Sequence, residues 1–159
     1  MAEWEIENAE DTLEGRFLTF GVSNEVFGID IQHVVEIVGM QPITTVPEYP
    51  EYISGIINLR GKIIPVMDVR LRFKKPKREY DSRTCIIVID TGVIQIGLIV
   101  DSVSEVLDIT KSDTVPPPDM YKGGRPFVSA IGKVGEEIKL LLDCQKLLDD
   151  EDYLLFEYD

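Results

Sequence analysis

The same pattern of residues occurs twice along this 159-residue chain. Residues 17–36 align with residues 86–105 at an offset of 69, and after a six-residue insertion in the second copy the offset becomes 75. The matched pairs include Gly28 with Gly97, Val34 with Val103, Glu36 with Glu105, Ser54 with Ser129, Ile56 with Ile131, Ile63 with Ile138 and Asp68 with Asp143. An internal repeat of this kind indicates one supersecondary unit built twice. The sequence therefore predicts two half-sized modules with one topology.

Each copy has the pattern of a β protein. Short runs rich in Val, Ile and Phe alternate with Gly, Pro and Asn, which is typical of strands joined by turns. The predicted strands are 17–22, 26–31, 53–58, 62–67, 85–90, 94–100, 127–132 and 138–142. Short, evenly spaced strands favour an all-β (mainly) fold of two duplicated, small, SH3-like five-stranded β-barrels packed together. The segments VVEIV and SEVLDI are predicted as either a helical turn or a further strand.

The predicted organisation has four parts. Residues 1–15 are an acidic, disordered N-terminal tail, residues 16–82 the first barrel and residues 83–150 the second, with strand exchange between the barrels left open. Residues 151–159 are an acidic C-terminal tail. Leucines at 147, 148, 154 and 155 recur seven apart and predict a short C-terminal helix.

Charge and hydropathy exclude several classes of partner. The net charge of −13 and the pI near 4.5 disfavour nucleic acid and anionic lipid. The chain has no secretory leader pattern and no apolar run of spanning length, so we expect a cytoplasmic protein with no membrane insertion and two reduced cysteines. Six basic residues between Arg70 and Arg78 separate the copies; a solvated connector is favoured over a nucleic-acid patch.

No catalytic motif or metal-binding spacing is present, so we predict a non-enzyme without cofactor or metal. The carboxylates Asp68 and Asp143, or Glu36 and Glu105, could in principle act as acid–base pairs. However, a residue that recurs at one position in both modules more simply caps a turn. The only histidine, His33, lies beside two valines and has no nucleophile nearby in sequence.

The copies differ most at one hairpin. INLRGK at 57–62 aligns with GKVGEE at 132–137. Arg60-Gly61 is predicted to form the tip of a tight turn, where a guanidinium is presented to solvent and can bind a partner's carboxylate or carbonyl. Alternatively, Asn58 and Arg60 cap the turn or pair with Glu36. Leu59 is either a core residue or an anchor for a partner.

The blocks FLTFGVSNEVFGIDIQHVVEI, GIINLRGKIIPVMDVRLRF, GLIVDSVSEVL and LLLDCQKLL resemble the successive signature blocks of the CheW family of bacterial chemotaxis coupling proteins, over residues 16–150. The resemblance implies two SH3-like barrels with a hydrophobic seam. It implies a non-catalytic adaptor, monomeric on its own, that links the cytoplasmic tip of methyl-accepting chemoreceptors to the regulatory domain of the histidine kinase CheA in receptor arrays. The receptor groove would include Glu36, Ile37, Asn58, Leu59, Arg60 and Gly61.

The same resemblance leaves a second interpretation open. The chain could be the CheW-like module of a larger chemotaxis regulator, or serve a chemosensory pathway that does not drive flagella. The start at Met1 and an end soon after the last block favour a free-standing protein.

Overall fold

The computed structural model describes residues 15–117 and 127–156. The predicted N-terminal tail therefore lies outside the described residues except for Gly15, as do part of the second-copy loop and the last three residues. In the first copy, the strands are β1 (Arg16–Val22), β2 (Glu25–Asp30), β3 (Val34–Gly39), β4 (Ile53–Leu59) and β5 (Lys62–Asp68). In the second copy they are β6 (Cys85–Asp90), β7 (Gln95–Val100), β8 (Ser102–Asp108), β9 (Thr114–Val115), β10 (Val128–Val134) and β11 (Glu137–Leu142).

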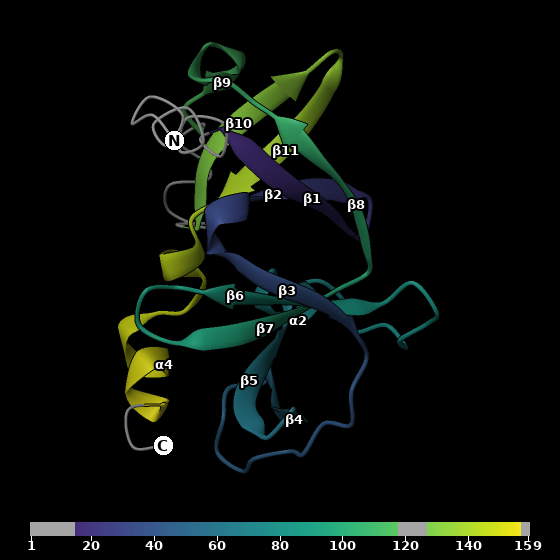
Figure 1. Cartoon of the computed structure of the whole chain (residues 1–159), viewed down its shortest axis with the longest axis vertical. Helices are drawn as coiled ribbons and strands as arrows, with labels where there is room; N and C mark the ends of the chain where they lie inside the picture. The colour runs from purple at the N-terminus through teal and green to yellow at the C-terminus, as the bar shows by residue number, and fades with distance from the viewer. Residues whose placement is uncertain (1–14, 118–126, 157–159) are drawn as a thin grey trace, which may run out of the picture.

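The prediction of a mainly β fold of two small SH3-like barrels is confirmed. Every predicted strand is present with its ends within two residues, and VVEIV and SEVLDI form the strands β3 and β8. Two sheets, one above the other in Figure 1, make up the molecule. We name the upper one barrel A (order β8-β1-β2-β11-β10-β9) and the lower one barrel B (order β3-β6-β7-β5-β4).

The barrels are not the two halves of the sequence. Barrel A combines the first hairpin of the first copy, β1–β2, with the later strands of the second copy, and barrel B combines β6–β7 with β3, β4 and β5. The chain crosses from A to B at the 3-10 turn Ile31–His33 (η1) and returns between β7 and β8. The predicted boundary near residue 82 is therefore wrong for the barrels, because β5 and β6, on either side of it, both belong to barrel B.

Strand registers show that the exchange is symmetric. The parallel pair β11–β2 places Leu141 opposite Gly28, and the parallel pair β5–β7 places Val66 opposite Gly97. These two pairs are related by the sequence offsets of 75 and 69. Both glycines leave room for their partners in these pairs, since a Cβ on Gly28 would lie 2.8 Å from Leu141 and one on Gly97 would lie 2.9 Å from Val66.

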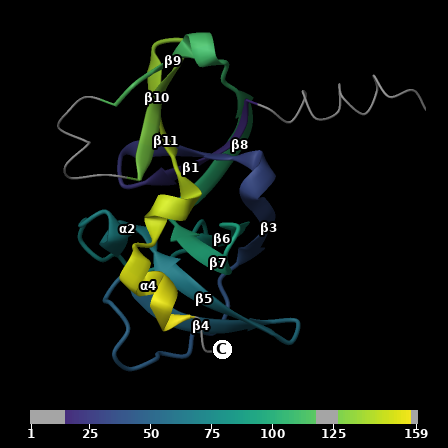
Figure 2. The ribbon, with the colours of Figure 1, turned by 90° about the vertical axis from the view of Figure 1, so that its left-hand side faces the viewer.

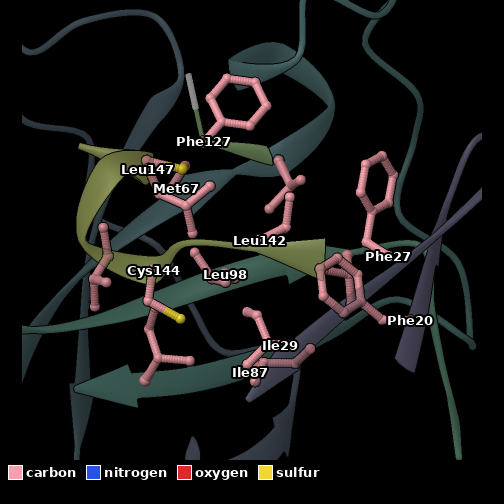
Figure 3. Close-up of a cluster of buried hydrophobic side chains, with 14 of the residues drawn as sticks. Phe20, Phe27, Ile29, Met67, Ile87, Leu98, Phe127, Leu142, Cys144 and Leu147 are labelled. Atoms are coloured by element: carbon pink, nitrogen blue, oxygen red, sulfur yellow. The ribbon is translucent and has the colours of Figure 1, made fainter. Parts of the chain in front are cut away.

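The main hydrophobic core lies between the barrels. Figure 3 shows Phe20 and Ile29 from β1–β2 on the side of Ile87 and Leu98 from β6–β7; Phe27, Met67, Phe127 and Leu142 belong to the same cluster. All eight side chains are buried. Full burial of one such side chain contributes roughly 1.5–3 kcal/mol, so this seam makes the two barrels one folding unit. A second, separate cluster fills the interior of barrel B.

The predicted short C-terminal helix is present, and it begins after Leu147 and Leu148. Helix α4 spans Asp150–Leu155, and Asp149 caps it in a capping box with Asp152. Leu147 and Leu148 precede that cap, in and after the 3-10 turn Cys144–Leu147 (η3), and are buried in the seam. Residues 151–156 are thus not simply a solvated acidic tail. Asp152 is buried and accepts a hydrogen bond from the Tyr52 hydroxyl, and Phe156 joins the core.

The basic connector between the copies begins with the short helix α2 (Val69–Arg72) and contains no strand before β6. Its cations are largely used within the fold. Arg70 forms a 2.9 Å ion pair with Asp101 at the crossing between β7 and β8, and Lys75 pairs with Glu25. Arg72 donates a 2.6 Å hydrogen bond to the Leu147 carbonyl and lies over the rings of Tyr52 and Phe127.

Candidate partner-binding site

The hairpin between β4 and β5 ends in a two-residue turn at Arg60 and Gly61. Both residues have positive φ, 53° and 87°, as a type I′ hairpin turn requires. The Asn58 side chain fixes the turn by accepting a 2.8 Å hydrogen bond from the Gly61 amide. Leu59 is buried in the barrel B cluster directly before the tip, so it supports the turn from beneath.

The guanidinium of Arg60 has a partner within the fold. It donates a hydrogen bond to the Glu36 carboxylate on β3, and the two groups form an ion pair that we call the clasp. The two edge strands of barrel B are β3 and β4, so the clasp joins one edge of the sheet to the hairpin at the other. Hydrogen bonding to Arg60 lowers the pKa of Glu36, and the same bond raises the pKa of Arg60. Both groups are therefore charged at neutral pH.

The clasp leaves most of the arginine accessible. The Arg60 side chain is 68% exposed and that of Glu36 29% exposed. A guanidinium has five N–H donors, and the clasp uses one terminal nitrogen, Nη2. The remaining donors are held by a rigid turn and can bind a second acceptor at little entropic cost. The capping alternative from the sequence is therefore present, since Asn58 caps the turn and Arg60 pairs with Glu36, and the Arg60 guanidinium is still largely exposed.

The predicted site residues do not all meet at one point. Glu36, Asn58, Arg60 and Gly61 come together at the clasp. Ile37 follows Glu36 on the same strand and points to the opposite face, where its side chain is 45% exposed. Leu59 is an internal residue rather than a contact for a partner.

Two exposed apolar side chains near these residues were not singled out from the sequence. Val35 lies on the same outward face of β3 as Ile37, and Ile63 is 57% exposed on β5 opposite Asn58. The alternation of the segment 34–39 could have found Val35, because its odd positions form one face of a strand. Ile63 could have been found by comparing the copies, since its counterpart Ile138 is exposed too.

The corresponding hairpin of barrel A has no clasp. Its turn carries Gly135 where Arg60 stands, with φ of 63°, followed by Glu136. Among the described residues no cation pairs with Glu105, the counterpart of Glu36. Its backbone is held instead by the Thr19 hydroxyl, which donates to the Glu105 carbonyl at 2.7 Å and accepts from the Glu105 amide at 3.2 Å.

The groups considered for catalysis have structural roles. Asp68 accepts hydrogen bonds from the amides of Arg70 and Leu71 at the start of α2, and Asp143 accepts one from Gln145 at the start of η3. The prediction that these two aspartates cap turns is confirmed. Burial raises the pKa of the Cys144 thiol to about 12, which keeps it protonated and unreactive. In residues 15–117 and 127–156 no cluster of His, Cys, Asp and Glu could hold a metal ion.

His33 is hydrogen bonded through Nδ1 to the Asp90 carbonyl at 3.1 Å. Both cysteines are free thiols; Cys144 is buried and Cys85 partly buried. No helix among the described residues is long and apolar enough to cross a bilayer.

Comparison with known proteins gives one consistent result. The model of the CheW-like domain matches residues 16–152. A chemotaxis protein CheW of Klebsiella aerogenes is 36% identical over 150 residues, which cover 94% of this chain and 90% of that protein. One of Rhizobium meliloti is 37% identical over 136 residues, covering 85% and 88%. The crystal structure of the scaffolding protein TtCheW from Thermoanaerobacter tengcongensis superposes with a TM-score of 0.81 at 37% identity, covering 87% of this chain and 94% of that one.

Proposed function

Because the chain belongs to the CheW-like domain family, we propose that it is a non-catalytic chemotaxis adaptor that couples methyl-accepting chemoreceptors to the histidine kinase CheA. Relatives named as chemotaxis proteins match nearly their full length, and one structural neighbour is named as a scaffolding protein. In this role the protein works in the cytoplasm and is recruited to the inner face of the membrane through the receptors.

One observation carries the assignment of the receptor site: the exposed Arg60 on a rigid turn, oriented by Glu36. A receptor carbonyl or carboxylate binds the free face of the guanidinium. The exposed Ile63, opposite Asn58 in the same hairpin, and the exposed Ile37 on the outward face of β3 add apolar contact. Arginine is enriched among residues that dominate interface energies because its planar fork bonds in two directions. The buried Leu59 contributes indirectly, by keeping the turn in place.

An adaptor without chemistry transmits a signal only if its partners' states differ in affinity for it. The two barrels share one topology but end differently: the barrel B hairpin carries a cation and the barrel A hairpin carries Glu136. Such unlike ends suit the bridging of two unlike partners. Because the seam packs the two barrels against each other, a partner bound to the barrel B hairpin is held in a fixed orientation relative to a partner bound to barrel A.

The direct test is Arg60→Glu, titrated calorimetrically against a receptor cytoplasmic fragment. The substitution places a second carboxylate beside Glu36 and removes the donors, so we expect affinity to fall by at least about tenfold. Because the side chain is exposed, circular dichroism should remain that of the wild type, and the unfolding transition should shift only by the small contribution of a surface ion pair. Affinity within twofold of wild type would contradict the assignment.

A matched control is Arg16→Glu. Arg16 also forms an exposed, inter-strand ion pair, at 3.2 Å to Asp108, but in barrel A. It should leave receptor affinity unchanged, which separates loss of the site from loss of charge. Both variants should also be titrated against the CheA regulatory domain. If the clasp binds the receptor and not the kinase, the affinity of Arg60→Glu for the kinase domain should equal that of the wild type.

A further inference from the structure

Barrel A has a pocket of about 790 Å³ at one end. Its walls come from the start of β1, the end of β8, and β10 and β11; Figure 2 shows β9 and β10 on one side of this barrel and β8 on the other. The apolar part of the lining is Phe17, Ile109, Ala130 and Leu141. Sites for small molecules typically measure about 300–1,000 Å³, so the volume is that of a ligand site.

The corresponding end of barrel B is closed. Met40 and Ile43, from the segment after β3, pack against its interior cluster. The same segment is tied down by two 2.9 Å hydrogen bonds between the backbones of Thr44 and Ile56. It lies directly on Gly55, where a Cβ atom would be 2.1 Å from the Thr44 carbonyl oxygen.

In barrel A, the residue aligned with Gly55 is Ala130. A covering segment cannot approach it as closely as Thr44 approaches Gly55, because the alanine Cβ occupies that space. The segment after β8 accordingly pairs with Ile131 through Val115, two positions further along than its counterpart in barrel B. Ser112 stands where Ile43 closes barrel B. The pocket is thus a consequence of these substitutions between the copies.

The charges at the mouth define the ligand's polar end. Arg16 is neutralised by Asp108 at 3.2 Å. Lys111 also lines the pocket, and in the described parts of the chain its ammonium makes neither a hydrogen bond nor an ion pair. The nearby hydroxyls are already used as donors: that of Thr114 bonds to the Lys111 carbonyl at 2.8 Å and that of Ser129 to the Leu141 carbonyl at 3.2 Å. One uncompensated cation therefore stands beside an apolar cavity.

We propose that this pocket binds a small amphiphilic anion, with an alkyl or aryl body against the partly exposed Phe17 and Ala130, above the buried Ile109 and Leu141, and a carboxylate or sulfonate head on Lys111. Burial of the apolar body supplies most of the affinity. The ammonium selects the acid over a neutral analogue, locally and against the overall negative charge of the chain.

The probe is 8-anilinonaphthalene-1-sulfonate, titrated into the full chain and followed by fluorescence. We expect one saturable site, lost in Ala130→Phe, which places a phenyl ring where the apolar body of the ligand would lie, and weakened about tenfold in Lys111→Glu. Lys146→Glu is the matched control, because Lys146 is exposed on η3 and does not line the pocket. Octanoate should displace the probe at lower concentration than 1-octanol does.

Methyl NMR spectra of the wild type locate the site independently of any variant. Shifts confined to Ile109, Ala130 and Leu141 are expected. Shifts centred on other methyl groups, binding that Lys111→Glu leaves unchanged, or equal displacement by octanoate and 1-octanol would each overturn the proposal.

Discussion

Barrels A and B have the same strand arrangement but different interiors. The interior of barrel B is closed by apolar side chains, among them Ile57, Ile64 and Val88. The aligned residues in barrel A are Gly132, Lys139 and Thr19. Barrel A nevertheless holds together, because the seam that it shares with barrel B contains most of the buried apolar residues. A duplicated module can therefore lose its own packed interior when a common core stabilises both copies.

The largest effect should come from exchanging one interior residue between the copies. Ile64 is buried in barrel B, and its counterpart Lys139 is buried in barrel A with its ammonium bonded at 2.6 Å to the exposed carboxylate of Glu137. At the position aligned with Glu137, barrel B has Lys62. Ile64→Lys would therefore bury a cation next to another cation, and we expect the free energy of unfolding to fall by about 3–5 kcal/mol in urea denaturation.

The reciprocal variant, Lys139→Ile, is the control. It replaces a buried cation by an apolar side chain and leaves Glu137 in water, so the free energy of unfolding should rise, by about 1 kcal/mol. Equal destabilisation by both variants would contradict the view that barrel A tolerates the charge because of its open, partly polar interior.

A somewhat smaller effect is expected at the position that opens or closes the barrel end. Gly55→Ala places a Cβ against the Thr44 carbonyl, at a residue whose φ is +150°. Displacement of the covering segment and backbone strain should together lower the free energy of unfolding by about 2–4 kcal/mol. Ala130→Gly at the aligned position in barrel A should lower it by only about 0.5–1 kcal/mol. Similar losses at both sites would show that the covering segments do not differ as described.

The third comparison concerns the aligned aspartates. Asp68 is buried and accepts a 2.9 Å hydrogen bond from the Tyr80 hydroxyl in addition to capping α2. Asp143 is only partly buried, and its side chain caps η3. Asp68→Ala should lower the free energy of unfolding by about 2 kcal/mol and Asp143→Ala by about 1 kcal/mol or less, measured by thermal and chemical denaturation. A larger loss of unfolding free energy for Asp143→Ala than for Asp68→Ala would contradict this comparison.

The strands and the duplication could be predicted from the sequence because both depend on local patterns. Runs such as CIIVID and turns such as Arg60-Gly61 determine their own structure, and two of the predicted site residues, Glu36 and Arg60, meet as the sequence alternatives allowed. The exchange of hairpins could not be derived in the same way. Since the copies share one topology, β2 presents the same edge to β11 as β7 presents to β5, and nothing local distinguishes pairing within a copy from pairing between copies.

Tertiary context also decides two features that single residues leave open. A proline is normally confined to an edge strand or a bulge, and Pro65 lies in β5 between β4 and β7, next to a register shift in the β4–β5 pairing at Ile53/Gly55. The ladder to β7 involves only Val66, Met67 and Asp68, so the missing amide of Pro65 falls outside it. The leucine repeat begins at Leu147, but the capping box of Asp149 starts the short helix only after Leu148. The open end of barrel A could not be predicted from the sequence for the same reason. Ala130 opens it only by keeping the segment after β8 from covering that end, and this contact is not local in sequence.

The smallest expected effect is the pH dependence of the clasp. The pKa of Glu36 is lower in the folded protein because of Arg60, so the contribution of this pair to stability is present above the pKa of the unfolded chain. It is lost as the pH falls below about 4.5 and through the folded-state pKa. Glu36→Gln should therefore flatten part of the acid limb in a plot of unfolding free energy against pH. Because both groups of the clasp face solvent, added salt should reduce the difference between wild type and Glu36→Gln. A salt-independent difference would instead mean that the clasp acts as a buried strut rather than as a surface ion pair whose cation a partner can recruit.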